Sequence, residues 1–145
     1  MAMAERTMSF RGNEVEFTEI YPAIDLVWNF VDKIKADDGA ILGYRVISNI
    51  GYYSGKYKKF IVCEAGDRSD GATGAKDLDS FGWLFHDELC SECIFEDGTP
   101  CTNWQASNIL SEIMRMEGFW FREKTWFWST WFLGGKKIIR TNGWR

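Results

Sequence analysis

Residues typical of β-strands gather in the first half of the chain and helical patterns in the second, and this order restricts the fold more than any other feature. Between the halves lies GDRSDGATGAKDLDS, residues 66–80, with four Asp and three Gly. Glycine and aspartate at this density predict an ordered loop with unusual backbone angles. A chain that runs from strands through a loop to helices is typical of an α+β domain.

The clearest β element is a predicted hairpin. YRVISNIGYY, residues 44–53, and KKFIVCEAG, residues 58–66, are rich in β-branched and aromatic residues and flank a turn signal at 54–56. Earlier in the chain, apolar residues at helical spacing predict a helix between 21 and 35, with Pro22 in its first turn and Gly39 after its end. The β-branched content of that segment leaves a strand as the alternative.

Two helices are predicted after the loop. FGWLFHDELCSEC, residues 81–93, follows Ser80 or Asp79 as a cap, and Thr102 with Gln105 matches a capping box for a helix that Gly118 ends. Helices joined by so short a loop pack antiparallel. We therefore expect an α+β domain in which a small antiparallel sheet packs on an antiparallel helical hairpin. The aromatic-rich C-terminal segment would close the core.

Length and charge limit the classes of function. The 145 residues suit a single domain, 1–145, with a loose N-terminus at 1–7 and a basic tail at 136–145. A net charge of −4 argues against a nucleic-acid partner, because such surfaces need an excess of cations. No apolar run approaches the ~20 residues of a spanning helix, and no export signal precedes residue 10, so a cytoplasmic protein is expected.

A His-Asp pair in the first helix is the main candidate for catalysis. His86 is the only histidine of the chain, so any imidazole-based mechanism depends on it. Asp87 follows directly, and Asp70 lies on the upstream glycine-containing loop, where the two carboxylates would share a Ca²⁺ ion. The alternative is a structural histidine that is hydrogen-bonded within the helical hairpin.

The cysteines offer a second interpretation of His86. The spacing His86-x3-Cys90-x2-Cys93-x7-Cys101 supplies four side chains of the types that Zn²⁺ prefers. Three of these side chains would lie on one helical face, with Cys101 at the start of the partner helix. Against a zinc site, paired cysteines within a continuous helix are more often small buried apolar residues.

The C-terminal aromatic residues are expected to lie mostly in the core, and any that stay exposed would form a surface for a protein partner. This predicted surface combines aromatic and cationic side chains: Trp126, Trp128, Trp131, Lys136 and Lys137. Contact with a membrane interface, without crossing it, is the alternative use of such a surface.

Residues 44–135 resemble a phage and prophage family catalogued as domain of unknown function 1353. The passage 69–74, SDGATG, is similar to its Asp-Gly-Ala-Ser/Thr motif, and 83–89, WLFHDEL, to its Trp-x-x-His-Asp-x-Leu helix. Residues 106–118 resemble its second helix and 131–135 its closing aromatic-glycine segment. The resemblance implies an α+β domain of phage origin, and the family carries no established activity.

The paired helices of that family are similar to those of secreted phospholipases A2. This similarity implies His86 as a base and Asp87 as a Ca²⁺ ligand. The family has Asp after the residue matching Ala106, whereas this chain has Ser107, whose hydroxyl cannot stabilise an imidazolium as a carboxylate does. We therefore expect a non-enzymatic virion component or host-protein modulator, in virions or in the infected cell's cytoplasm. A Ca²⁺-dependent hydrolase is the alternative.

Overall fold

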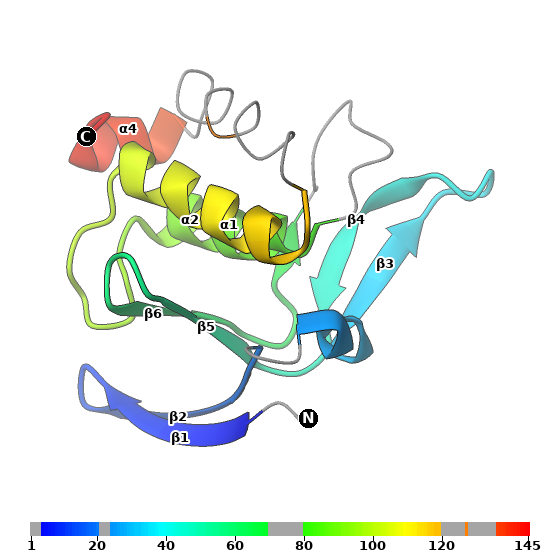
Figure 1. The fold of residues 1–145 in the computed structure, drawn as a ribbon, viewed down its shortest axis with the longest axis horizontal. Helices are drawn as coiled ribbons and strands as arrows, with labels where there is room; N and C mark the ends of the chain where they lie inside the picture. The colour runs from blue at the N-terminus through cyan, green and yellow to red at the C-terminus, as the bar shows by residue number, and fades with distance from the viewer. Residues whose placement is uncertain (1–3, 21–23, 70–79, 120–126, 128–135) are drawn as a thin grey trace.

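The computed structural model describes residues 4–20, 24–69, 80–119, 127 and 136–145 and has the expected α+β architecture (Figure 1). Strands form two sheets instead of one. The first has the order β1-β2-β5-β6, built from Ala4–Phe10, Asn13–Glu19, Ile50–Ser54 and Lys59–Cys63. The second has the order β3-β4-β7, built from Val31–Lys35, Ile41–Val46 and Arg68–Ser69.

The N-terminus is the first correction to the sequence prediction. Residues 4–7 belong to β1, which pairs antiparallel with β2 from Ala4 opposite Glu19 to Phe10 opposite Asn13. The turn between them is Arg11-Gly12, and both residues have positive φ, 52° and 81°, as a two-residue hairpin requires. The prediction of a loose terminus is wrong for residues 4–7, and it failed because β1 is mostly exposed and lacks the apolar alternation that identifies a strand.

The predicted helix between 21 and 35 is the second correction, because its described residues, 24–35, do not form an α-helix. Ile24–Asn29 forms a short 3-10 helix, η1, and Val31–Lys35 forms β3, so the strand alternative holds for the second half. The predicted hairpin at 44–66 is confirmed only between β5 and β6. Its first strand divides near residues 47–49, where the chain leaves β4 in one sheet and enters β5 in the other.

The helical hairpin is confirmed. Helix α1 spans Gly82–Glu92 and α2 spans Asn103–Met116, and the two pack against each other. The capping box at the start of α2 is present: the Thr102 side chain accepts from the Gln105 N–H, and the Gln105 side chain accepts from the Thr102 N–H. Gly118, with φ of 93°, follows the last turn as predicted.

The C-terminal residues are packed and form more than a tail. Lys136–Asn142 form helix α4, whose Ile138 is fully buried. The Asn142 side-chain amide donates to the carbonyls of Cys93 (2.6 Å) and Cys101 (2.7 Å). These bonds fasten α4 to the loop that joins α1 and α2.

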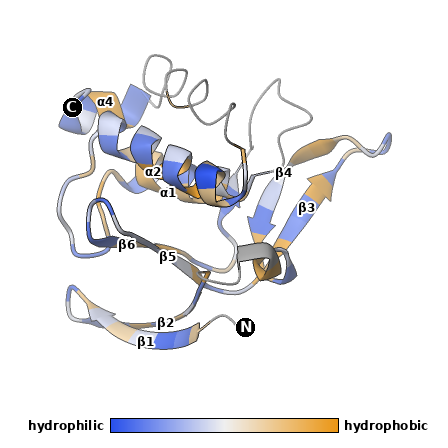
Figure 2. Cartoon of the chain, in the orientation of Figure 1, coloured by the Kyte–Doolittle hydropathy of each residue, from blue (hydrophilic) through white to orange (hydrophobic). Residues whose placement is uncertain are grey.

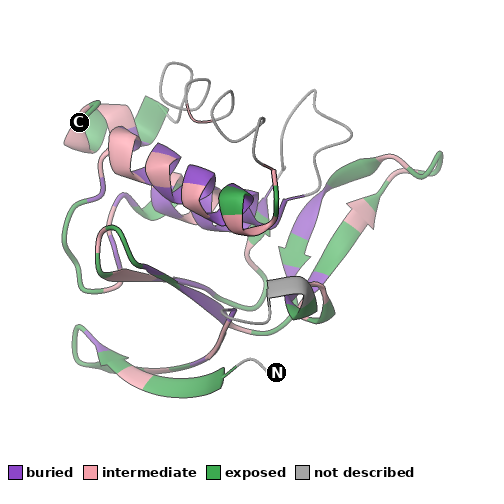
Figure 3. Ribbon diagram, viewed as in Figure 1, coloured by how far each residue is buried: buried purple, intermediate pink, exposed green. Residues whose placement is uncertain are grey.

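The main core lies between the helical hairpin and the strands. Its largest fully buried side chains come from both layers and include Tyr52, Phe81, Phe85, Phe95, Ile109 and Ile113. Figure 3 shows buried positions on the helices and along β5 and β6. A smaller cluster around Phe10, Phe17 and Val62 packs the β1–β2 hairpin against strand β6 of the same sheet. In the part of the chain that the structure describes, every helix is too short or too polar to cross a membrane.

Candidate functional site

The helix that carries the His-Asp pair is fixed at its start by the end of α2. Glu117, just after α2, accepts a hydrogen bond from the Ser80 hydroxyl and another from the Phe81 N–H. A carboxylate at the start of α1 also interacts favourably with the partial positive charge of the helix N-terminus. Gly82 lets α2 approach, since a β-carbon there would lie 3.1 Å from Leu110. Ser80, predicted as the cap, accepts from the Gly82 N–H, although the N-cap residue is Phe81.

His86 lies inside the protein beside two acidic partners. Its ring is 5% exposed and makes an edge contact with Trp83, the ring centres being 5.8 Å apart. Nδ1 lies 3.6 Å from Asp87 Oδ1, and Nε2 lies 3.7 Å from Cys90 Sγ. Burial lowers the pKa of His86, but its contacts with Cys90 and with the Asp87 carboxylate outweigh burial and raise the pKa from 6.5 to about 10.

Asp87 joins the His86 site to the beginning of the glycine loop. Its Oδ2 accepts a hydrogen bond of 2.5 Å from the hydroxyl of Ser69, which is 3% exposed and ends strand β7. The sequence predicts this neighbourhood, because Ser69 directly precedes Asp70. Asp70 itself lies outside the described residues, so the shared Ca²⁺ site stays a prediction.

This arrangement favours a charged pair more than a general base. A base must be unprotonated at the working pH, whereas a pKa of about 10 keeps the His86 ring protonated at neutral pH. The raised pKa therefore favours an imidazolium beside Asp87 over a neutral base. Ser107 is buried in α2.

In the described part of the chain, the four predicted zinc ligands are not gathered into a group placed to hold a metal ion. Among the residues that the structure describes, which include His86 and all four cysteines, no three His, Cys, Asp or Glu side chains are placed to hold a metal ion. Cys93 ends α1 in the left-handed conformation, with φ of 63°, and its thiol donates to the Cys90 carbonyl. Cys101 is fully buried and donates to the Thr102 carbonyl.

The predicted partner surface is placed only in part. Lys136 and Lys137 are exposed on α4, and Lys137 Nζ donates to the Ser91 carbonyl of α1 at 2.5 Å. Trp126, Trp128 and Trp131 lie outside the described residues. The cationic half of this surface therefore lies next to α1, and its aromatic half stays a prediction.

Sequence reasoning missed an acidic hollow of about 190 Å³ between α1 and the turn after β6. Burial and the neighbouring carboxylate of Asp67 raise the pKa of Glu88 to about 8. Glu92 and Glu96 add further negative charge. The i, i+4 spacing of Glu88 and Glu92 places them on one helical face, but only the fold brings Asp67 to that face.

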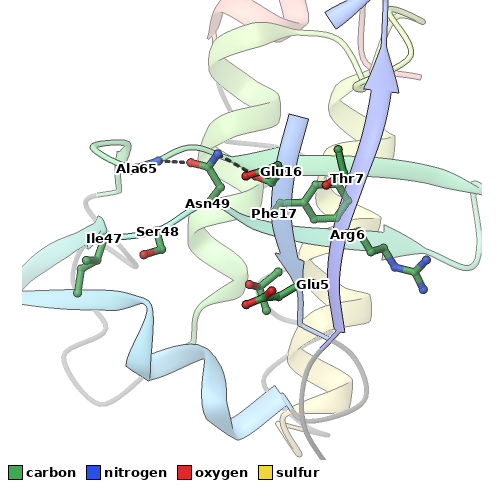
Figure 4. A pocket seen from close by; sticks show the side chains of 10 residues that line it. Glu5, Arg6, Thr7, Glu16, Phe17, Ile47, Ser48, Asn49 and Ala65 are labelled. Carbon is green, nitrogen blue, oxygen red and sulfur yellow. Dashed lines mark hydrogen bonds between the residues drawn. The ribbon is translucent and has the colours of Figure 1, made fainter. Parts of the chain in front are cut away.

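A second missed feature is an open groove of about 680 Å³ beside the β1–β2 hairpin (Figure 4). Asn49 forms part of its wall: its amide donates to the Glu16 carbonyl and its Oδ1 accepts from the Ala65 N–H. No sequence motif indicates this groove, because its walls come from segments about 60 residues apart.

Comparisons with known proteins give no relative. The chain matches no protein-family profile, no curated protein and no solved structure.

Proposed function

We propose that this chain is a phage-encoded, non-enzymatic protein that acts through protein contacts, as a virion component or as a modulator of a host protein. The observation that carries the proposal is the β3–β4 hairpin, which projects from the body of the domain (Figure 1). Two apolar side chains are exposed at the start of β4, Ile41 at 39% and Leu42 at 58%. The phage origin depends on the family resemblance.

These two side chains are adjacent in a strand, so they point to opposite faces of the hairpin. The outer part of β4 is coloured hydrophobic in Figure 2, away from the main core. A hairpin with apolar side chains on both faces, left uncovered by the described residues, is typical of a contact element. Charged residues on the pairing strand β3, Asp32, Lys33 and Lys35, oppose unspecific strand pairing at this edge.

The state of His86 supports the same proposal. The raised pKa of His86, which is buried beside Asp87, opposes a role of its ring as a general base. The β3–β4 hairpin, by contrast, exposes the apolar side chains of Ile41 and Leu42, which a protein partner would cover.

Affinity capture from infected cells and from purified virions tests the proposal. We expect the wild-type protein to retain a partner that the double variant Ile41→Ser/Leu42→Ser loses, with both proteins folded by circular dichroism. Leu26→Ser is the matched control, because Leu26 is 37% exposed on η1, outside the hairpin. Equal capture by all three proteins, or no partner in either source, would contradict the proposal.

A Ca²⁺-dependent hydrolase of phospholipase A2 type is the second candidate. One observation favours it: the Ser69–Asp87 hydrogen bond brings the start of the Asp70 loop beside the His-Asp pair. Asp70 and Asp87 would hold the ion, which would polarise an ester carbonyl, and His86 would have to lose its proton first. This candidate requires calorimetric Ca²⁺ binding and ester turnover that is lost in His86→Ala. A protein with neither property is not this hydrolase.

A further inference from the structure

Four strands form the edges of the two sheets in the described part of the chain, and three of them are protected against pairing with another chain. On β6, the Glu96 N–H donates to the Phe60 carbonyl and the Glu96 carboxylate accepts from the Val62 N–H, so this edge is covered. Strand β3 carries charged side chains and has an irregular register between Ile34 and Lys35. Strand β7 has only two residues. The fourth edge is β1.

Strand β1 is a long and regular edge. It pairs with β2 without a register shift from Ala4 to Phe10, and it contains neither proline nor lysine. Its one cation, Arg6, is engaged by Glu19 of β2. Figure 1 shows β1 at the outer margin of the domain, and among the described residues no segment pairs with its outer side. Such an edge is a template for another strand.

The backbone groups that β1 offers follow from bonds on the opposite side of β2. The Thr18 N–H donates to the Asn49 carbonyl, and the Glu16 carbonyl accepts from the Asn49 side chain. Thr18 and Glu16 therefore direct their backbone groups away from β1. Their partners in the antiparallel register, Glu5 and Thr7, direct theirs away from β2. The N–H and C=O groups of Glu5 and Thr7 thus point outward from the edge of the sheet.

We propose that β1 pairs antiparallel with β1 of a second copy of this chain, so that two four-stranded sheets join across a twofold axis. This inference goes beyond the proposed contacts of the β3–β4 hairpin and does not depend on them. A register centred on Thr7 uses the whole strand, because Thr7 is the middle residue of Ala4–Phe10. Thr7 then lies opposite Thr7 of the second copy, and cross-strand threonine pairs are favourable.

The charges on β1 favour this register. Centred on Thr7, it places Glu5 opposite Ser9 of the second copy. Arg6 lies opposite Met8, so no two like charges are directly opposed. A register centred on Arg6 would oppose two arginines, and one centred on Glu5 would oppose two glutamates. A register centred on Met8 would leave Glu5 beyond the end of the second strand.

The pairing closes at two copies. A twofold axis uses the same edge of both chains, and β6 at the far edge of each sheet is already covered by Glu96. One pair of strands buries less surface than the ~1,600 Å² of a standard interface. We therefore expect a weak dimer, with a Kd of about 10–100 µM.

Sedimentation equilibrium of the full-length chain over a concentration series measures this dimer. We expect the average mass to rise from 16.8 kDa toward twice that value between about 1 µM and about 500 µM. Thr7→Lys and Thr7→Glu each place two like charges at the axis, so the Kd of each variant should rise at least about fivefold. An equimolar mixture of the two variants should dimerise at least as tightly as wild type, because opposite charges then meet.

Recovery in the mixture also reports that both variants are folded. Thr141→Lys is the matched control, since it adds the same charge at an exposed position on α4, and it should keep the wild-type Kd. A mass that stays at 16.8 kDa throughout the series would overturn the proposal. Equal Kd values for wild type and Thr7→Lys would overturn it as well.

The variant Ile41→Ser/Leu42→Ser separates this pairing from the contact proposed for the β3–β4 hairpin. It should dimerise like wild type, because both changes lie outside β1. If this variant loses the dimer while Thr7→Lys keeps it, self-association belongs to the hairpin and the pairing of β1 is wrong.

A cysteine at the axis tests the register. Opposed residues of a hydrogen-bonded antiparallel pair have Cα atoms about 5.5 Å apart, which a disulfide can span. With oxidised glutathione, Thr7→Cys should form a covalent dimer at least about fivefold faster than Ser9→Cys, whose partner in this register is Glu5. Wild type, with its four native cysteines, gives the background rate. Equal rates for the two variants would refute a register centred on Thr7.

Discussion

Replacement of Ser69 by alanine tests whether Ser69, which directly precedes the glycine loop, is hydrogen-bonded to Asp87 of the His-Asp pair. Ser69 donates a 2.5 Å hydrogen bond to the Asp87 carboxylate and is 3% exposed. Hydrogen bonds to charged groups contribute about 1.5–3 kcal/mol. The Asp87 side chain is 37% exposed, so water can replace part of the lost contact in the variant. We therefore expect the free energy of unfolding to fall by about 1.5–2 kcal/mol.

For a domain of this length, a loss of that size lowers the melting temperature by roughly 5–7 °C. Urea titration of wild type, Ser69→Ala and the control Ser91→Ala measures the difference, and the exposed Ser91 should change stability by less than about 0.5 kcal/mol. A double-mutant cycle with Asp87→Asn then isolates the contact, with an expected coupling energy of about 1 kcal/mol. If Ser69→Ala is as stable as Ser91→Ala, or if the coupling energy is zero, the start of the loop is not held at Asp87 by this hydrogen bond.

Three further predictions concern the fold and its charges. Gly51→Ala should lower the stability measured by thermal unfolding by about 1–3 kcal/mol, because its β-carbon would lie 2.3 Å from the Phe17 ring. Gly55→Ala is the control, since its β-carbon has room, and it should lose clearly less stability. Equal losses would place Phe17 elsewhere. Asn142→Ala removes two hydrogen bonds to the α1–α2 loop, so it should lower the free energy of unfolding by about 1–3 kcal/mol and speed amide exchange at Cys101. No change in either quantity would mean that α4 does not fasten this loop. The raised pKa of His86 adds stability that is complete below pH 6.5 and is lost as the pH rises toward 10. In urea titrations over that pH range, the free energy of unfolding of wild type should fall by up to about 5 kcal/mol more than that of His86→Asn. Parallel curves for the two proteins would contradict a raised pKa.

Local signals were sufficient for the helical hairpin. Thr102 and Gln105 satisfy each other's backbone groups within one turn, and Gly118 ends the helix with a conformation that glycine adopts freely. These choices depend on neighbours in the sequence. The sequence therefore predicted the start and end of α2, the antiparallel packing of the helices and the α+β class.

The strands depended on contacts that local patterns do not contain. Strand β1 is polar and largely exposed, and it is held by pairing with β2 and by the cluster around Phe17, which requires Gly51 of another strand. In 21–35 the periodicity of apolar residues fitted a helix, but pairing of β3 with β4 decided for a strand at its end. Such pairing energy belongs to two segments together.

The candidate site shows the same division. The sequence by itself determined that His86, Asp87 and Cys90 share one helix, so that their side chains lie within one turn of one another. Only the tertiary structure decided that Ser69 reaches Asp87 and that the imidazole is buried, and this burial opposes the protonated form that Cys90 and Asp87 favour. The physical reason is that desolvation and hydrogen bonds between distant segments exist only once the chain has packed.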